Sequence, residues 1–485
     1  MSTSSHSLKF VLPQELIDKV VDEADFQSLK TLGLVSKQWC PRTRELLFKD
    51  INLSEKLDHP LDPATRCERL LELLEAKSEL RRLPRTLLIR SSTFDDEDWS
   101  LGWLQVCSDD VIKILGMLQN VNVVALREGR MRLDFCHLPL SLRAALYSFI
   151  SRRNVIELTL IGVRCMEMTP LVQHPSLQKL RLAFNHPLPA ELEPFPALKV
   201  GVKQWSTSEA ASLSSREDSA PPKKFLRHLD VTRAGSTLYL LVAASQNPQA
   251  TLDFTRIEWL KVGTLGFNTA MTRVWPHFLE TFCQNVSRYS VMRGPARPKP
   301  EHLLDGTLTF NPSLLPLAHL PNLERLRVDV PHYYLLTPGY SLFPYLLEAL
   351  AELSASRKPV PLSVLEIGIA FEGPPAGFEY EGIPHTVADL LRCEEIWERL
   401  DEILSDRQVF SQFKTVIVRM GRDARFTSPL SAKERKEMKD DIRSYMPNLV
   451  EQSKVKVVFR VPAGTSSAAP ATRKLKSCRF YDALT

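Results

Sequence analysis

Apolar residues at the first, fourth and sixth positions of short segments recur along this 485-residue chain, and this spacing limits the folds it can adopt. Six segments have it: Val155, Leu158, Leu160; Leu177, Leu180, Leu182; Leu226, Leu229, Val231; Ile257, Leu260, Val262; Leu323, Leu326, Val328; and Leu362, Leu365, Ile367. Alternate side chains of a strand share one face, so the fourth and sixth positions point into a core and the first closes the turn. The spacing is common by chance in a chain with 44% hydrophobic residues. Three of the segments directly follow a proline-containing break, which makes the spacing more significant than chance alone would. The breaks are His174-Pro175-Ser176, Leu320-Pro321-Asn322 and Pro359-Val360-Pro361.

Segments with the helical spacing of apolar residues alternate with these strands. The pattern predicts helices over 109–118, 141–150 and 341–353, and strands over 121–126, 155–161 and 362–371. Repeated alternation of helix and strand is typical of an α/β fold. The strand spacing resembles that of leucine-rich repeats, which implies an irregular helix-strand solenoid with unequal periods. The repeat asparagine that would connect successive turns is absent.

Residues 9–53, here called the head, precede this alternation and follow a different pattern. One face of a first helix, near whose start Pro13 lies, gathers Leu12, Leu16, Ile17, Val20 and Val21. Asp25 is a suitable N-cap for a second helix, and Pro41 suits the first turn of a third. Three short helices bury too little apolar surface for much independent stability. We therefore expect the head to be stabilised by packing against a partner, against the following chain or against both.

Three motifs of the head resemble the F-box, in the F-box-like variant widespread in mushroom-forming fungi. They are the Leu-Pro-x-Glu-Leu of 12–16, the Asp-x-x-Ser-Leu of 25–29, and the Leu-Val-Ser-Lys-Gln-Trp of 34–39. The match covers about a tenth of the chain. In that family the corresponding residues dock onto the Skp adaptor of a cullin-RING ubiquitin ligase. The resemblance therefore assigns to the adaptor Leu12, Pro13, Leu16, Ile17, Leu32, Val35 and Trp39.

The function implied by this resemblance is that of a substrate-recognition adaptor in an SCF-type cullin-RING ubiquitin ligase. The head would bind the Skp adaptor, and the repeat region would bind a protein target that the sequence does not identify. Such a protein is not an enzyme, because it supports ubiquitin transfer through proximity alone.

Two alternatives to the ligase adaptor stay open. In the first, the chain is a stand-alone interaction module without ligase coupling, and Leu12, Pro13 and Leu16 are buried against its own repeat region. In the second, the later α/β region is an unrecognised enzyme, which a pocket with converging titratable residues would indicate.

The predicted layout has three parts. The helical head spans 9–53, and the α/β repeat region spans 57–462. Two segments of low complexity interrupt the repeat region as surface loops, at 206–224 and 293–300. The tail, 463–485, is rich in Ala, Ser, Thr and Pro and then basic, so we expect it to be flexible at least in part.

A search for chemistry gives no catalytic residue, cofactor or metal site. The chain lacks the phosphate-binding, hydrolase, metalloprotease and kinase motifs. Its nearest candidates for reactive clusters are Cys136-His137 and His332-Tyr333-Tyr334, for which packing is the simpler interpretation. The acidic segment 95–98 lacks the glycine and the distal glutamate of a calcium loop.

Charge and cysteine content indicate the compartment and the partners. The net charge of +5 is small for this length and gives no reason to expect nucleic acid or lipid as a partner. Eight cysteines without a C-x-x-C pair indicate reduced thiols, mostly buried, in an intracellular protein of the cytoplasm, the nucleus or both. No window approaches eighteen uninterrupted apolar residues, so we expect no membrane partner.

Overall fold

A computed structural model of the chain shows an α/β protein that divides into two compact units. Unit 1 comprises Met1–Met166 with Thr472–Thr485, and unit 2 comprises Glu167–Ala471. The structure describes residues 12–54, 62–91, 103–128, 133–183, 186–187, 224–232, 234, 237–238, 240–241, 250–263, 269–292, 315–331, 343–370, 394–420, 432–451 and 456–460.

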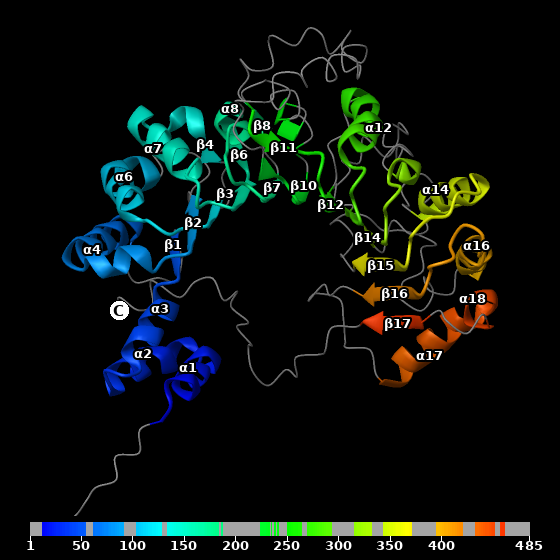
Figure 1. The fold of residues 1–485 in the computed structure, drawn as a ribbon, viewed down its shortest axis with the longest axis horizontal. Coiled ribbons are helices and arrows are strands. Elements are labelled where there is room, and N and C mark those ends of the chain that lie inside the picture. The colour runs from blue at the N-terminus through cyan, green and yellow to red at the C-terminus, as the bar shows by residue number, and fades with distance from the viewer. Residues whose placement is uncertain are drawn as a thin grey trace, which may run out of the picture. The chain divides into compact units, whose positions relative to one another are not determined.

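Unit 1 begins with the three helices of the head and continues as alternating helices and strands (Figure 1). Its helices are α1 (Gln14–Glu23), α2 (Phe26–Val35), α3 (Cys40–Leu47), α4 (Pro63–Ala76), α5 (Trp103–Val106), α6 (Ser108–Met117) and α7 (Leu140–Ile150), with the short 3-10 helices η1 (Ser78–Arg82) and η2 (Phe135–His137). Its strands are β1 (Asp50–Ser54), β2 (Thr86–Ser91), β3 (Val123–Glu128), β4 (Leu133–Asp134), β5 (Glu157–Ile161) and β6 (Val163–Met166).

Four strands of unit 1 form a parallel sheet in the order β1-β2-β3-β5. Helices α4, α6 and α7 lie together on one side of these strands (Figure 1). The short strands β4 and β6 pair with each other separately. Because each strand pairs with the strand of this sheet that follows it along the chain, every connection moves by one position across the sheet.

Unit 2 repeats this arrangement over more strands. Its helices are α8 (Thr169–Val172), α12 (Thr269–Phe282), α14 (Phe343–Ala355), α16 (Glu394–Leu404), α17 (Ala432–Ser444) and α18 (Pro447–Glu451), with the 3-10 helix η7 (Leu317–His319). Its strands are β7 (Lys179–Ala183), β8 (His186–Pro187), β9 (Lys224–Phe225), β10 (His228–Thr232), β11 (Leu252–Asp253), β12 (Trp259–Val262), β13 (Arg288–Met292), β14 (Arg325–Pro331), β15 (Val364–Ala370), β16 (Thr415–Met420) and β17 (Lys456–Arg460).

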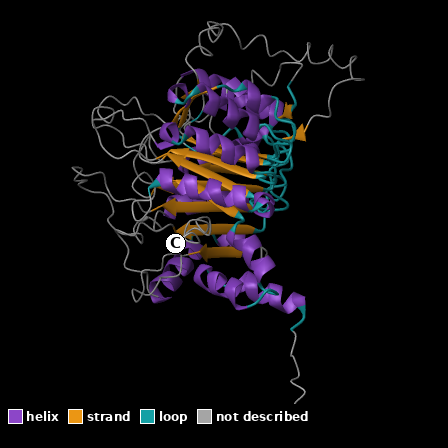
Figure 2. Cartoon of the chain, turned by 90° about the vertical axis from the view of Figure 1, so that its left-hand side faces the viewer, coloured by secondary structure: helices purple, strands orange, loops and turns teal. Residues whose placement is uncertain are grey.

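Eight strands of unit 2 form a parallel sheet in the order β7-β10-β12-β13-β14-β15-β16-β17. Helices α12, α14, α16 and α18 lie on one side of it (Figure 1), and the strands stack with a common direction (Figure 2). We call the other side the open face, because no described helix covers it. Strands β9 and β11 pair with each other outside this sheet.

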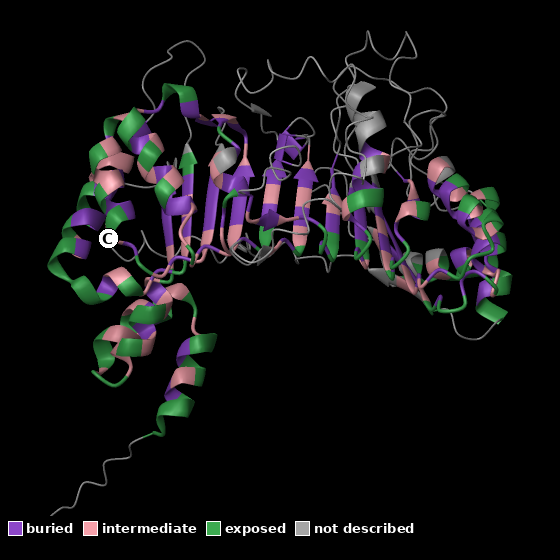
Figure 3. Cartoon of the chain, turned by 45° about the horizontal axis from the view of Figure 1, so that its top comes forward, coloured by how far each residue is buried: buried purple, intermediate pink, exposed green. Residues whose placement is uncertain are grey.

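The strand register of unit 2 places equivalent apolar residues next to one another in two continuous buried rows. The middle row contains Leu180, Leu229, Leu260, Tyr289, Leu326, Leu365 and Val416. The last row contains Leu182, Val231, Val262, Val291, Val328, Ile367 and Val418. Figure 3 shows the buried positions concentrated along the strands. The core of unit 2 is therefore a layer between the sheet and the helices, built from one three-residue set for each of the strands from β7 to β16.

Four asparagines connect successive helix-strand units. Each lies directly before the first apolar residue of its strand segment, and its side-chain amide donates to a backbone carbonyl of the preceding unit. The bonds run from Asn120 to Arg82 (2.9 Å), Asn154 to Gln119 (2.7 Å), Asn285 to Thr255 (2.8 Å) and Asn322 to Gln284 (2.7 Å). The expectation that no asparagine connects the turns is wrong, because the residue precedes the strand segment.

The expected alternation of helix and strand is confirmed, and boundaries differ by a few residues. The α/β class is also confirmed, whereas the leucine-rich-repeat solenoid stays a prediction, as do the domain boundaries at 53 and 57. Strand β1, helix α12 and strand β13 were not predicted. Among the predicted loops and tail, 293–300 and 463–485 lie outside the described residues, as does 206–224 apart from Lys224, the first residue of β9.

Candidate functional site

The head is the first candidate site, and local rules explain its three helices. Helix α1 follows Pro13, as predicted. The Asp25 carboxylate caps α2 by accepting a hydrogen bond from the Ser28 amide at 2.8 Å, which lowers the pKa of Asp25 below its usual value. Arg42 on α3 forms ion pairs with Asp22 at 2.8 Å and Glu45 at 2.7 Å, so that it connects the third helix to the first.

A small core holds the three helices of the head together. Its buried members are Ile17, Val21, Leu29 and Leu47. Around them pack the partly buried Ala24, Phe26, Leu32, Trp39, Leu46 and Phe48. The core is small because α1 and α2 each turn only one face inward.

Several large apolar side chains of the head face outward. Nine such side chains are exposed in the described part of the chain, and five of them belong to the head: Leu12 (44% exposed), Leu16 (51%), Val20 (50%), Leu34 (88%) and Val35 (66%). We call these five residues the exposed apolar set. The head, at the lower left of Figure 3, is largely exposed.

One hydrogen bond connects the start of α1 to the segment that follows α2. The Gln38 side chain, after α2, donates to the backbone carbonyl of Leu12 at 3.2 Å. Leu16 and Val20 lie one turn apart on α1, so they share a face of that helix. The start of α1 and the segment that follows α2 therefore lie next to each other.

The seven residues assigned to the adaptor divide into three groups. Leu12, Pro13, Leu16 and Val35 are exposed. Ile17 is buried in the core of the head, while Leu32 and Trp39 pack half-buried against that core. The assignment of all seven to the adaptor stays a prediction. Sequence reasoning missed Val20 and Leu34, although Val20 has the same spacing from Leu16 as Leu16 has from Leu12.

The exposure of Leu12 and Leu16 bears on the first alternative to the ligase adaptor. A stand-alone module was expected to bury Leu12, Pro13 and Leu16 against its own repeat region. In the structure these three residues are exposed. The feature that would favour that alternative is therefore missing at these positions.

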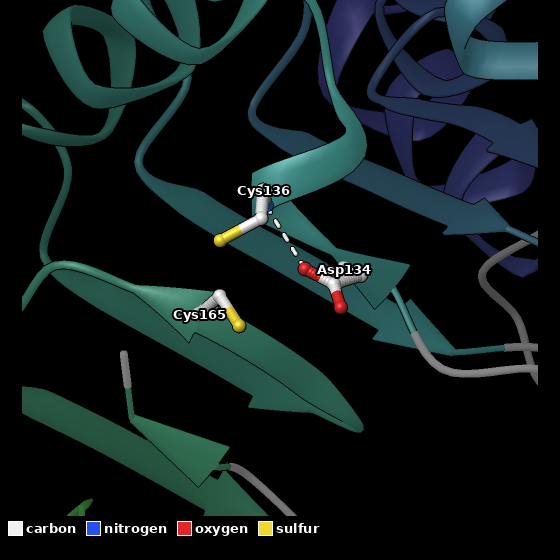
Figure 4. A group of neighbouring side chains, drawn as sticks. All are labelled: Asp134, Cys136 and Cys165. Carbon is white, nitrogen blue, oxygen red and sulfur yellow. Dashed lines mark hydrogen bonds between the residues drawn. The ribbon is translucent and has the colours of Figure 1, made fainter. Parts of the chain in front are cut away.

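A second candidate site lies in unit 1, where Asp134, Cys136 and Cys165 converge (Figure 4). One ligand atom from each of the three residues lies within 4.8 Å of the other two. Burial and its two neighbours raise the pKa of the Cys165 thiol to about 12. His137 is close to this cluster, with its Nδ1 4.0 Å from Asp134 Oδ2. Of the two clusters considered from the sequence, only Cys136-His137 can be assessed, because 332–334 lies outside the described residues.

The open face of unit 2 presents a third feature, a buried carboxylate among arginines. Glu366 on β15 is 1% exposed and forms ion pairs with Arg325, Arg327 and Arg419, of which the Arg327 contact is 3.4 Å. Asp329 also binds Arg327, at 2.9 Å, and burial raises the pKa of the Asp329 carboxyl above its usual value. Three arginines thus face two carboxylates, which leaves positive charge at this position.

The same excess recurs toward the other edge of this sheet. Arg181 on β7 and Lys261 on β12 both form ion pairs with Asp230 on the strand between them, at 3.3 Å and 3.1 Å. Lys179 and Arg288 lie on flanking strands at alternate positions that face the same side. The described residues of the open face therefore carry an excess of basic over acidic side chains, although the whole chain has a net charge of only +5.

Comparison with known proteins gives no assignment. A scan against models of protein families finds no match to this chain, and a search of curated proteins finds none either. Among the described helices, none combines the length and apolar character needed to cross a membrane.

Proposed function

We propose that this protein is the substrate-recognition adaptor of an SCF-type cullin-RING ubiquitin ligase and binds the Skp adaptor through its head. The observation that supports this proposal is the exposed apolar set, four of whose five members lie within the motifs that resemble the F-box. Contiguous exposed apolar residues on a folded protein mark interaction sites. The five side chains are 44–88% exposed, so covering each contributes part of the free energy, about 1.5–3 kcal/mol, that is gained when a fully exposed Leu or Val side chain is buried.

In the head, the residues that hold the fold together differ from those that are free to contact a partner. Its core residues hold the three helices together, and other residues remain outside for a partner. Ile17 and Leu16 illustrate this difference: adjacent positions on α1 lie about 100° apart around the helix axis, and Ile17 is 1% exposed whereas Leu16 is 51% exposed. In this proposal Ile17, Leu32 and Trp39 support the adaptor-binding surface from beneath, and Leu12, Pro13, Leu16 and Val35 touch the adaptor.

We further propose that the remainder is a leucine-rich-repeat-like solenoid. Three observations support it: strand order follows chain order, one set of three apolar residues occurs per strand, and asparagines connect neighbouring units. Each unit buries its apolar set against its neighbours, which is how solenoid proteins gain stability.

The protein target, in this proposal, binds to the open face of unit 2. The ion pairs around Glu366 and Asp230 hold their arginine and lysine partners in place, and the surplus of cations suits a target with an acidic segment. The head and this face would thus bring a ubiquitin-charged enzyme and a target together. We place this activity in the cytoplasm, the nucleus or both, which agrees with the free thiols of the six described cysteines.

The experiment that tests the proposal is co-expression of the full chain with a Skp adaptor, followed by purification through a tag on one partner. The native chain is compared with a Pro13→Ser, Leu16→Ala double variant and with Leu140→Ala, which removes an exposed leucine outside the head. We expect the native chain and Leu140→Ala to co-purify with the adaptor, and the double variant to lose it while its circular dichroism stays native. A folded native chain that never co-purifies with the adaptor, or a double variant that binds as well as the native chain, would sink the proposal.

A further inference from the structure

The cluster of Asp134, Cys136 and Cys165 is built by two short strands that pair in parallel. Strand β4 pairs with β6 through Leu133 with Val163 and Asp134 with Arg164. The chain leaves β4 into η2, where the Asp134 carboxylate accepts a hydrogen bond from the Cys136 amide at 2.9 Å. This bond fixes Asp134 and Cys136 beside each other, while Cys165 approaches from β6 (Figure 4).

The backbone of β6 departs from a regular strand at the third residue of the cluster. Cys165 has a φ of 53°, one of two positive values among the described residues other than glycine. Residues with a Cβ atom adopt this region at a cost of about 1–2 kcal/mol. In a regular strand Cys165 would point away from the face that Arg164 shares with Asp134. The left-handed conformation interrupts this alternation, and the Cys165 sulfur lies near the other two groups (Figure 4).

The donor atoms define the kind of ligand that fits. Two thiol sulfurs and one carboxylate oxygen lie mutually within 4.8 Å. A tetrahedral zinc site with Zn–S distances of about 2.3 Å separates its ligand atoms by roughly 3.5–4 Å, so small side-chain rotations suffice to close the site. The His137 side chain is 65% exposed and its Nδ1 lies 4.0 Å from Asp134 Oδ2, which makes it the candidate for the fourth ligand. Sulfur ligands exclude Ca²⁺ and Mg²⁺, which require oxygen.

We propose that Asp134, Cys136 and Cys165, with His137 as the fourth ligand, form a binding site for a divalent cation of the zinc type. This site is independent of the proposed ligase function. The cation would connect η2 to β6 and thereby join two segments between which α7 and β5 lie along the chain. The unfolded chain does not hold these ligands together, so the ion would bind the folded chain and stabilise this part of unit 1.

The test uses full-length protein that has been purified under reducing conditions, stripped of metal with a chelator and titrated with Co²⁺. Cobalt in a tetrahedral site with thiolate ligands gives a sulfur-to-metal absorption band in the near ultraviolet and intense bands in the visible. We expect one equivalent of Co²⁺ to produce both, and one equivalent of Zn²⁺ to remove them. Cys136→Ser and Cys165→Ser should each abolish the sulfur band or weaken cobalt affinity by at least about tenfold.

Two further variants separate ligation from folding. Asp134→Asn keeps an oxygen acceptor for the Cys136 amide, so it should preserve η2 and still weaken cobalt affinity. Cys40→Ser removes a partly buried thiol of the head that is outside the cluster and should leave the titration unchanged. The proposal is overturned if the native protein gives no sulfur band, or if Cys136→Ser and Cys165→Ser keep the band and it is lost in Cys393→Ser or Cys478→Ser. It is also overturned if mass spectrometry finds a Cys136–Cys165 disulfide in protein purified under reducing conditions.

Discussion

The side-chain amide of Asn322 donates a hydrogen bond to the backbone carbonyl of Gln284, 2.7 Å away in the preceding helix-strand unit. Gln284 is itself followed by Asn285, whose amide donates to Thr255 one unit earlier. The two asparagines therefore form consecutive steps of one ladder. Because each step connects the turns before two neighbouring strands, it fixes where the next strand begins.

We predict that Asn322→Ala lowers the free energy of unfolding of unit 2 by about 1 kcal/mol, the net value of one lost hydrogen bond. The measurement is the midpoint of denaturant unfolding, supported by hydrogen exchange in β13 and β14. Gln412→Ala is the matched control: Gln412 is exposed at the same position before Phe413, and the described structure shows no hydrogen bond of its side chain. Equal losses in the two variants would contradict the role given to Asn322.

Whether a helix or strand could be predicted from the sequence depends on how regular the spacing of its apolar residues is. Spacing of apolar residues identified the strands with Leu at most core positions, such as β7 and β14, since alternation there is unambiguous. Strand β13 was missed because Tyr289 occupies the position in the middle buried row where most other strands have Leu. Helix α12 was missed at Pro276, a residue that ordinarily ends a helix.

The candidate sites follow from sequence to a different degree. Residues of the head are close along the chain, and the resemblance to the F-box selected Leu12, Leu16 and Val35, which are exposed. Local pattern could not tell that Ile17 faces inward, because which side of a short helix its neighbours cover depends on tertiary packing. The meeting of Cys136 with Cys165 depends on the pairing of β4 with β6, and no spacing within the sequence records it.

Adjacent residues of α1 should separate stability from binding. Ile17→Ala removes a side chain that is 1% exposed in the core of the head, so we predict a loss of about 2–4 kcal/mol in its stability. Leu16→Ala removes an exposed side chain and should change stability by less than about 0.5 kcal/mol. Proteolysis of the head and hydrogen exchange in α1 measure the difference. Similar protection in both variants would show that the head is not organised around Ile17.

The cap of α4 makes one contribution to stability depend on pH. The Asp62 carboxylate accepts hydrogen bonds from the Thr65 amide at 3.0 Å and the Thr65 hydroxyl at 2.5 Å, and these bonds lower the pKa of Asp62. A carboxyl whose pKa is lower in the folded state binds fewer protons there than in the unfolded state. Its contribution is therefore complete above the unfolded pKa of about 3.9 and disappears as the pH falls through the lower folded value.

Two substitutions at this cap should respond differently. Asp62→Ala removes the cap and should cost about 1 kcal/mol at pH 7. Asp62→Asn keeps an acceptor but not the charge, so we expect a loss of only a few tenths of a kcal/mol at pH 7, given how exposed the group is. Unfolding midpoints between pH 7 and pH 2.5 should show the native chain and Asp62→Asn converging as the pH falls. A constant difference across this range would contradict the assigned role of the charge.

Removal of the Glu366 carboxylate from the open face should leave the positive charges of the neighbouring arginines without a counter-charge, so that they repel one another. Glu366→Gln deprives Arg325, Arg327 and Arg419 of a shared partner, and the neutral amide cannot offset their charges. We predict that unit 2 loses about 2 kcal/mol of stability, less than for a fully buried pair because the arginines are about one third exposed. Added salt should recover part of this loss, since it screens the repulsion among the three cations.

The pKa of Asp329 is a second, independent measurement of the effect of Glu366→Gln. The negative charge of Glu366 is one of the causes that raise the Asp329 pKa, after burial, so its removal in Glu366→Gln should lower that pKa. Carboxyl titration by NMR measures the change. Glu324→Gln, which neutralises an exposed carboxylate just before β14, should leave both stability and the Asp329 pKa nearly unchanged. If Glu366→Gln also left both unchanged, the three arginines would not depend on Glu366, and the open face would lack the fixed cations that recognition of an acidic target requires.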